Sequence, residues 1–270
     1  MSSLGKLEKK LKQNYKLTIV EEQLLIYKPL YTIRITKPLN RNKEEYKELL
    51  YPEEEALELR DFKAMDYYAV ENYELPIELM MENAGLQLAN LITNISKKEQ
   101  IIKIGIGNGN NGGGGLVAAR RLAAWGYKVH LDIFNDIIND LPKTQLKRAL
   151  MFGAQSTTPP HYEVWVDAYL GFSQRLPLSD ILLSRLEEAN SSESLRISLD
   201  IPTGFNGDGK AVYFNCDKIL TLAAPKKVLY KLPESTEIFI ADIGIPQAVY
   251  QKFGIDTMDF DTSNILKLVR

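Results

Sequence analysis

The sequence predicts an α/β protein: a three-layer αβα sandwich around a mainly parallel, Rossmann-like sheet, with an extra N-terminal extension. Three observations lead to this prediction. Short apolar runs alternate with amphipathic runs over roughly 200 residues, as in sheets whose strands are joined by helices. A glycine- and asparagine-rich run at residues 107–115 separates a strand-like run from a helix-like run. Several apolar runs end in polar residues, at the carboxyl strand ends where such sheets bind ligands.

The composition indicates a globular protein and argues against several classes of function. The 270 residues are 45% hydrophobic and 25% charged, which suits one large domain with a small appendage. A net charge of −2 provides no general attraction for nucleic acid, so we expect no nucleic-acid partner. No apolar run reaches the roughly 18 residues that span a bilayer, and the N-terminus lacks the apolar core of a secretory signal. We therefore expect a cytoplasmic protein without a membrane partner.

Cysteine and histidine are scarce in this chain. Cys216 is the single cysteine, which excludes an internal disulfide and a multi-cysteine metal site. His130 and His161 are the only histidines, so zinc chemistry based on histidine is not expected.

Residues 1–56 are expected to form an N-terminal extension, followed by a nucleotide-binding domain over residues 57–270. The segment from Leu4 to Leu11 is typical of a short polar helix. The next segment, KLTIVEEQLLIYKPLYTIRIT, predicts a β-hairpin around Lys28-Pro29. Because no catalytic pattern occurs here, we interpret the extension as structural or as a dimer contact.

Two helices, a strand–helix–strand unit and further alternating elements are predicted in the domain. Apolar residues at helical spacings, among them Phe62, Met65 and Ala69, predict the first helix, and Pro76 begins the second, IELMMENAGLQLANLI. The run IIKIGIG predicts a strand, LVAARRLAAWG a helix ending at Gly126, and YKVHLDIF a parallel strand. A helix is then expected over residues 141–151 and another in SDILLSRLEEAN. Further strands are expected in EVWVDAYLGF, LRISLDIPTGF, CDKILTLAAPK and TEIFIADIGIP.

The glycine-rich run predicts a cradle for phosphate or another anion. Six of its nine residues are glycine and three are asparagine. Glycine lets a ligand approach the backbone, and the free N–H groups of a following helix favour negative charge. Gly107, Gly109 and Gly112 also satisfy the spacing of a dinucleotide fingerprint, with Asp132 in the position of a ribose-binding acid. This alternative, a hydride-transfer oxidoreductase, lacks a recognisable catalytic pair and is the least favoured interpretation.

Six motifs in order resemble the NAD(P)H-hydrate epimerase family, also called the YjeF N-terminal domain family. The run Asn110–Gly115 followed by LVAARRLAAWGYKV resembles the family's glycine-rich loop and helix. LMMENAG at residues 79–85 and VDAYLG at residues 166–171 are similar to two further family segments. DIPTG at residues 200–204, APK at 224–226 and DIGIP at 242–246 are similar to three more. The resemblance covers about residues 60–246 and leaves residues 1–56 unmatched.

The resemblance implies an isomerase that interconverts the R and S hydrates of NADH and NADPH, acting as a homodimer. Hydrated NADH or NADPH would be its small-molecule substrate. A potassium ion is implied at Asn111, Asp167 and Thr203, where Thr203 replaces the usual serine but keeps a hydroxyl. The implied substrate-binding residues are Asn110, Asn111, Gly112, Gly113, Gly114, Gly171, Phe172, Ser173, Gln174, Arg175, Leu176, Pro177 and Asp200.

Asp167 and Asp200 are the candidate catalytic residues. Each ends an apolar strand, where strand packing does not require an acid. A carboxylate there can bind a cation, accept hydrogen bonds from sugar hydroxyls or move protons. Helix capping or turn formation is the structural alternative for both. Arg175 could pair with a phosphate, or it could be an ordinary exposed arginine.

Gly114 stands where the family's loop carries an aspartate. Glycine keeps the backbone path open but removes one carboxylate from the expected crevice. If that carboxylate transfers protons, its loss costs about 10²–10⁴ in rate. The alternative function is therefore a catalytically impaired module of the same fold that binds a nucleotide or a protein partner, as enhancer-of-decapping proteins illustrate. Compensation by a nearby acid such as Glu82 or Asp132 is left open by the sequence.

Overall fold

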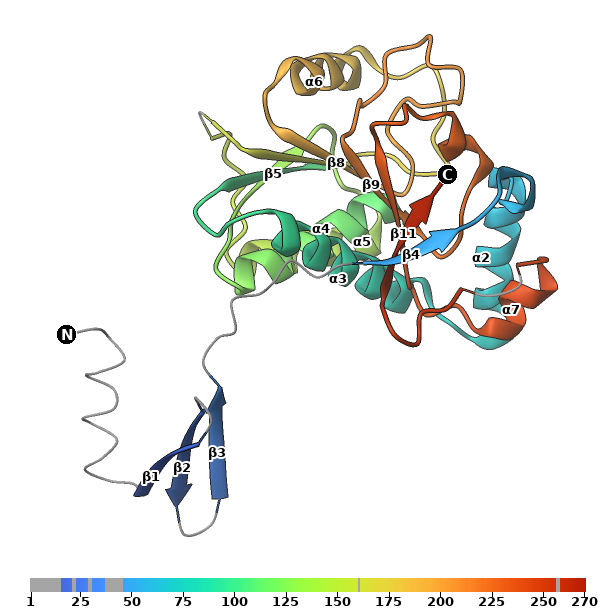
Figure 1. Ribbon diagram of the computed structural model, residues 1–270. Coiled ribbons are helices and arrows are strands. Elements are labelled where there is room, and N and C mark those ends of the chain that lie inside the picture. The colour runs from blue at the N-terminus through green and yellow to red at the C-terminus, as the bar shows by residue number, and fades with distance from the viewer. Residues whose placement is uncertain (1–15, 21–22, 29–30, 37–45, 160, 256–257) are drawn as a thin grey trace. The chain divides into compact units, whose positions relative to one another are not determined.

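The chain forms two compact units, Met1–Glu44 and Glu45–Arg270, called here the N-terminal unit and the main unit. The computed structural model in Figure 1 describes residues 16–20, 23–28, 31–36, 46–159, 161–255 and 258–270.

The described part of the N-terminal unit is a three-stranded antiparallel sheet. Its strands are β1 (Lys16–Val20), β2 (Gln23–Lys28) and β3 (Tyr31–Thr36), hydrogen-bonded in the order β1-β2-β3. The predicted hairpin corresponds to β2 and β3, and β1 adds a third strand. The polar helix predicted between Leu4 and Leu11 lies outside the described residues.

An eight-stranded sheet forms the centre of the main unit. Its strand order is β4-β11-β10-β9-β8-β7-β5-β6. Strands β5 to β10 all run parallel, whereas β11 is antiparallel to β10 and parallel to β4. The strands have the bounds β4 (Lys47–Leu50), β5 (Ile101–Ile106), β6 (Lys128–Ile133), β7 (Val164–Ala168), β8 (Leu195–Leu199), β9 (Lys218–Leu222), β10 (Glu237–Ala241) and β11 (Ile265–Val269).

Helices cover both faces of this sheet, which confirms the predicted three layers. Helices α3, α4 and α5 pack side by side on one face, and α2, α6 and α7 contribute to the core on the other face (Figure 1). The helices are α2 (Leu59–Tyr73), α3 (Ile77–Ile95), α4 (Asn110–Ala124), α5 (Asp140–Met151), α6 (Asp180–Ser191), α7 (Gln247–Lys252) and the short 3₁₀ helices η1 (Glu53–Glu55) and η2 (Lys227–Lys231).

Side-chain alternation along the central strands separates the two halves of the core. In β7, Val164 and Val166 pack in the core that includes α3, α4 and α5, whereas Trp165 belongs to the core on the opposite face. Because successive strand residues point to opposite faces, Asp167 lies on the same side as Trp165. This alternation directs the acid of β7 toward the face that carries α2, α6 and α7.

The main unit begins earlier than the sequence predicts. Strand β4 pairs with β11 from Lys47 opposite Leu266 to Leu50 opposite Val269. Residues 45–56 therefore belong to the main unit, which starts at Glu45 rather than at residue 57. The difference arises because a four-residue edge strand inside a charged segment carries too little apolar pattern to be recognised. Strand β11 (Ile265–Val269) and helix α7 (Gln247–Lys252) were not predicted either.

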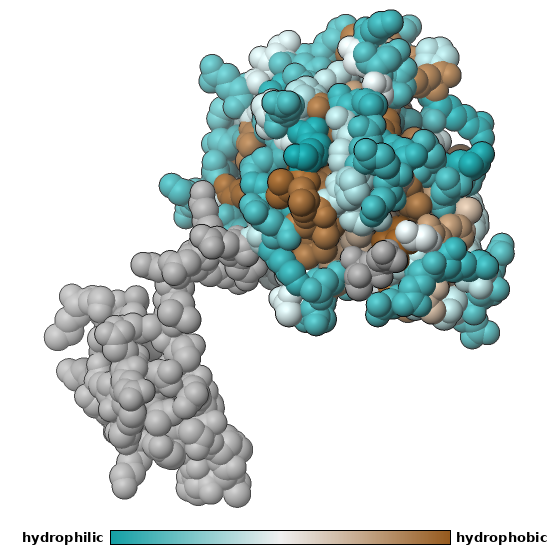
Figure 2. Space-filling model, turned by 45° about the vertical axis from the view of Figure 1, so that its right-hand side comes forward, coloured by the Kyte–Doolittle hydropathy of each residue, from teal (hydrophilic) through white to brown (hydrophobic). Residues whose placement is uncertain are grey.

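The surface of the main unit agrees with a globular composition. The face drawn in Figure 2 is largely hydrophilic and is interrupted by small groups of apolar side chains. Among the described residues, no helix is both long enough and apolar enough to cross a membrane.

The strand order reverses beside β5. The chain leaves β5 for β6 on one side and later enters β7 on the other side. The segments that follow β5 and β7 therefore diverge at the carboxyl edge of the sheet, and open α/β sheets bind ligands in the crevice at such a point.

Candidate active site

Helix α4 begins inside the glycine-rich run, at Asn110, and not after it. The glycines form its first turns because the helix packs too closely on its neighbours to admit side chains. A Cβ atom at Gly112 would lie 1.9 Å from the carbonyl oxygen of Gly107, and one at Gly113 would lie 2.5 Å from Cε of Met81. The predicted glycine loop is thus a short turn joined to a closely packed helix start.

The N-terminus of α4 opens toward the crevice. Gly109 is the N-cap residue and provides no side-chain hydrogen bond to the helix. Asn108 fixes the preceding turn, because its Oδ1 accepts hydrogen bonds from the amides of Ile138 and Asn139 at 2.7 and 3.0 Å. Backbone N–H groups and the positive end of the helix dipole therefore point into a rigid, anion-favouring corner.

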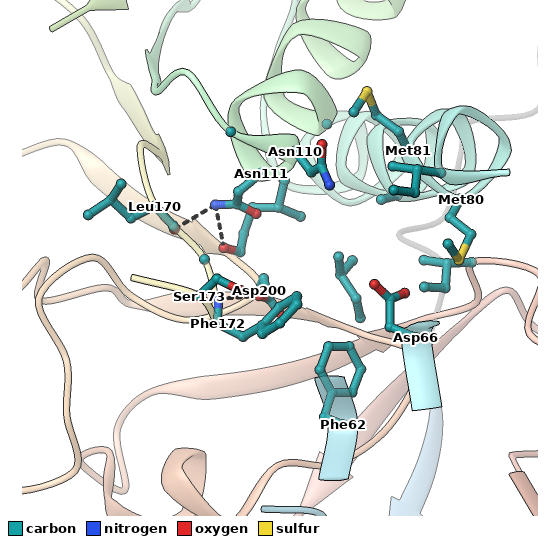
Figure 3. Close-up of a pocket in the computed structure, with 18 of the residues that line it drawn as sticks. Phe62, Asp66, Met80, Met81, Asn110, Asn111, Leu170, Phe172, Ser173 and Asp200 are labelled. Atoms are coloured by element: carbon teal, nitrogen blue, oxygen red, sulfur yellow. Dashed lines mark hydrogen bonds between the residues drawn. The ribbon is translucent and has the colours of Figure 1, made fainter. Parts of the chain in front are cut away.

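A pocket of about 250 Å³ lies at this corner, between α2, α3, α4 and the segment after β7 (Figure 3). Eight of the predicted binding residues line it: Asn110, Asn111, Gly114, Gly171, Phe172, Ser173, Gln174 and Asp200. Its remaining walls are largely apolar and include Phe62, Tyr67, Val70, Ile77, Met80, Met81, Leu170, Leu199, Leu222 and Ile243.

The other predicted residues lie outside the pocket lining. Gly112 and Gly113 are packed inside the first turn of α4. Arg175, Leu176 and Pro177 are exposed to solvent beyond the lining segment. Arg175 is therefore exposed, as expected if it is an ordinary surface arginine and does not bind a phosphate.

Asp167 is completely buried and fully hydrogen-bonded. Its Oδ1 accepts from the Thr203 hydroxyl at 2.6 Å and from the Tyr169 amide at 3.2 Å. Its Oδ2 accepts from the Ser198 hydroxyl and the Thr203 amide, both at 2.8 Å. The pKa of Asp167 is raised to about 6, because burial outweighs the opposing effect of its hydrogen bonds, led by that from the Thr203 hydroxyl. Because Asp167 does not line the pocket, its contacts assign it to holding the Thr203 segment and not to proton exchange with a ligand.

Asn111 joins the segments after β7 and β8. Its Nδ2 donates to the carbonyl oxygens of Leu170 and Leu199 at 2.6 and 3.2 Å. Its Oδ1 is buried without a hydrogen-bond partner among the described residues. An unpartnered buried oxygen is costly, so this position favours a cation or a donor group on a ligand.

Asp200 lies at the floor of the pocket in a left-handed backbone conformation with φ of 71°. Its Oδ2 accepts from the Phe172 amide at 2.7 Å, which links the acid to the segment after β7. A Cβ atom at Gly171 would lie 2.9 Å from the same oxygen and 3.1 Å from Cγ of Asn111. A side chain there would displace Asp200 or Asn111, so the glycine lets both residues approach the same stretch of backbone. Strained backbone in this position is typical of functional sites.

Lys226 is a buried partner of Asp200. Its Nζ lies 3.1 Å from Asp200 Oδ1 and donates to Thr221 Oγ1 and the Leu222 carbonyl at 2.7 and 2.8 Å. It also lies 3.7 Å from the centre of the Phe62 ring. Burial lowers the pKa of Lys226, and the charge of Asp200 acts in the opposite direction. Lys226 of the APK motif therefore holds Asp200 of the DIPTG motif in place through this ion pair.

Asp66 of α2 is a second acid in the pocket lining. The pKa of Asp66 is raised to about 6, chiefly by burial and also by the charge of Asp200, with the charge of Lys226 acting in the opposite direction. Sequence reasoning gave Asp66 no role because it sits in an amphipathic helix among charged residues. Its spacing of four residues from Phe62, a core position, is the signal that could have indicated an inward-facing acid.

Glu82 and Asp132, the acids that could compensate for the carboxylate absent at Gly114, are bound to other residues. Glu82 accepts hydrogen bonds from Arg120 and Arg121 at 2.5 and 3.0 Å. Asp132 accepts from the Tyr169 hydroxyl at 2.6 Å and does not line the pocket. This placement also removes the support for Asp132 as a ribose-binding acid in a dinucleotide fingerprint.

The chain matches the family model described as YjeF-related protein N-terminus over residues 77–228, just over half of its 270 residues. The chain belongs to the YjeF N-terminal family. The matched range of this YjeF domain includes α3, the start of α4, the segment after β7 and Asp200. Helix α2 with Asp66 lies outside it.

Relatives of this YjeF domain carry the names of hydrate epimerases. The NAD(P)H-hydrate epimerase of Rhodopirellula baltica is 32% identical over 212 residues, covering 72% of this chain and 86% of the relative. The NAD(P)H-hydrate epimerase of Dehalogenimonas lykanthroporepellens is 32% identical over 206 residues, covering 72% and 83%. The bifunctional NAD(P)H-hydrate repair enzyme Nnr of Thermofilum pendens is 31% identical over 223 residues, 74% of this chain and 42% of that enzyme.

A solved structure supports the fold of the YjeF domain. The crystal structure of yeast ynu0 matches with a TM-score of 0.71 and 23% sequence identity, covering 79% of this chain and 99% of the yeast chain.

Proposed function

We propose that this protein is an NAD(P)H-hydrate epimerase that interconverts the R and S hydrates of NADH and NADPH. The observation that carries the proposal is the pocket at the strand-order reversal, where Asp200 and the open N-terminus of α4 line the same space. The epimerase names of relatives with about one third sequence identity support the same reaction.

One part of the pocket is polar and another part is apolar. The pyrophosphate of a dinucleotide would bind at the N-terminus of α4, formed by Gly109, Asn110 and Asn111. The hydrated nicotinamide ring would pack against the apolar side chains of Met80, Phe172 and Leu199. We assign the ring to the side of the pocket that holds Asp200.

Epimerisation at the hydrated carbon requires loss and return of water. A proton passes from an acid to the hydroxyl oxygen, the C–O bond breaks with its electron pair going to oxygen, and the ring nitrogen stabilises the cation formed. Water then adds to the opposite face and gives a proton to a base. Asp200 is the residue that we assign to proton exchange at the ring, because it lines the pocket and Lys226 holds it in place. Asp167 positions the Thr203 segment.

A potassium ion at Asn111, Asp167 and Thr203 is part of this proposal. Asn111 Oδ1 supports the ion, since it is a buried oxygen without a hydrogen-bond partner among the described residues. The other two donors, the Asp167 carboxylate and the Thr203 hydroxyl, are hydrogen-bonded to each other and would bind the ion beside or in place of that bond. These are the hard oxygen ligands that alkali cations prefer. A bound cation would supply positive charge that stabilises the buried oxygens. A homodimer in the cytoplasm is the assembly and location that we propose.

Chromatographic measurement of hydrate interconversion tests the reaction. Purified full-length protein is incubated with the separated S and R hydrates of NADH and of NADPH, and their ratio is followed by liquid chromatography. We expect equilibration well above the spontaneous rate, and a loss of about 10²–10⁴ in the Asp200→Asn variant. Equilibration at the spontaneous rate with all four hydrates would overturn the proposal. Light scattering of the same preparation checks the dimer.

A further inference from the structure

We propose that Asp66 is a second catalytic residue of the pocket, working with Asp200 and supplying the carboxylate that Gly114 does not provide. The inference rests on the proposed function and assigns a role to a helix outside the matched family range. In the forward direction Asp66 gives a proton to the departing hydroxyl, and Asp200 takes one from the water that adds to the opposite face of the ring. In the reverse direction the two roles exchange.

The position of Asp66 is the first support. Phe62, Asp66 and Val70 are spaced four residues apart on α2, and all three line the pocket. Figure 3 shows the Asp66 carboxylate directed into the pocket from the wall that carries Phe62, with Asp200 on another wall. Two carboxylates on different walls are the arrangement that a reaction at both faces of one ring requires.

The surroundings of the two acids differ, which is the second support. Asp200 is 2% exposed, accepts from the Phe172 amide and is ion-paired with Lys226. Asp66 has no such close partner among the described residues: the charges of Asp200 and Lys226 act on it through space, and burial has the largest effect on its pKa. A pair of acids in unlike environments can divide the acid and base roles between them.

The pocket lining gives the third support. Asp66 and Asp200 are its only acidic side chains among the described residues. Glu82 and Asp132, the other candidates, are bound to arginines and to Tyr169. The site of the missing carboxylate faces the same space, because Gly114 also lines the pocket.

An asparagine substitution tests the role of Asp66 with a close control on the same helix. We compare Asp66→Asn with Asp61→Asn, whose side chain is 42% exposed and bonded to the neighbouring Arg60. Asp66→Asn should lower the epimerisation rate by about 10²–10⁴ with little change in KM, and Asp61→Asn should leave both unchanged. In the unmodified protein the rate should fall as pH rises through about 6, where Asp66 releases its proton, and Asp66→Asn should remove this limb.

A second variant separates proton transfer from structural support. Added formate should raise the epimerisation rate of the Asp66→Ala variant at least tenfold, because a small acid can occupy the vacated space. A structural role would not respond to formate. An active unmodified protein whose Asp66→Asn variant keeps the rate and the pH limb would overturn this inference and leave the proposed function intact. An unmodified protein without activity would instead overturn the proposed function.

Discussion

Nζ of Lys226 lies 3.1 Å from Oδ1 of Asp200 beneath the pocket, with the lysine side chain fully buried and that of the aspartate 2% exposed. The same Nζ group donates two hydrogen bonds to β9, through Thr221 and Leu222, so the pair is held by the sheet. Each residue compensates the buried charge of the other, so removal of either one should destabilise the folded protein.

Lys226→Met should destabilise the protein by about 3–5 kcal/mol, because it leaves the Asp200 carboxylate buried without its cation. Urea unfolding measures this loss. Lys227→Met is the matched control: Lys227 is 35% exposed in its ion pair with the exposed Glu58, and its removal should cost about 0–1 kcal/mol. Equal losses in the two variants would contradict the importance of the buried pair.

The stability that Asp66 contributes should fall as pH rises from about 4 to about 6. Its folded pKa of about 6 exceeds the ordinary value of 3.8, so the folded protein keeps a proton that the unfolded chain has released. Two pKa units correspond to about 3 kcal/mol. The unfolding free energy of the unmodified protein minus that of Asp66→Asn should therefore decrease by up to about 3 kcal/mol over this range. Urea titrations at pH 4, 5, 6 and 7 check the slope, and a difference that stays constant or grows with pH would count against it.

Gly114→Asp should change the epimerisation rate by no more than a few-fold, because Asp66 already provides a second carboxylate. A Cβ atom at Gly114 would lie 3.2 Å from Cδ2 of Leu199, so Leu199 must shift slightly, at about 1–3 kcal/mol of stability. Gly112→Ala is the contrasting variant, since its Cβ would lie 1.9 Å from the Gly107 carbonyl oxygen and should disrupt the start of α4. A rate gain of a hundredfold or more in Gly114→Asp would mean that the natural protein is impaired.

Potassium should raise the melting temperature and the epimerisation rate of the unmodified protein relative to tetramethylammonium at equal ionic strength, because a ligand that binds the folded state stabilises it. Thermal scans and rate assays in the two chloride salts make the comparison. Thr203→Val, which removes one of the proposed ligands, should weaken both responses, whereas Thr93→Val on α3 should not. Identical behaviour in both salts would exclude a functional cation at this position.

The parts of the site that lie in continuous motifs could be predicted, and the parts that depend on distant elements could not. Asn111, Gly171 and Asp200 follow strands of a βαβ pattern, and that pattern places carboxyl strand ends together. Asp66 comes from a helix that precedes the first parallel strand, so no local pattern shows that α2 closes the pocket. The role of Asp167 also depends on the fold, because its four hydrogen bonds come from β8 and the segments that follow β7 and β8.

The fold itself was predictable where long elements repeat a regular pattern. The βαβ alternation gave the parallel strands and the layers, whereas β4 was hidden in the charged residues before Leu57. The start of α4 was misplaced because glycine usually signals a loop, and only the close packing against Gly107, Met81 and Ala168 explains why these positions in the helix are glycine.

The glycine-rich start of α4 has a consequence for the order in which the molecule assembles. Each glycine disfavours a helix by about 1 kcal/mol relative to alanine, so Gly112–Gly115 oppose helix nucleation by about 4 kcal/mol. We therefore expect this turn to form only when α3 and the strands β5 and β7 pack around it, and to open before the rest of α4. Its amide hydrogens should exchange with solvent faster than those of Leu116–Leu122, and a bound dinucleotide should slow them. The end of α4 to which we assign the substrate is thus the part of the helix that we expect a bound dinucleotide to stabilise most.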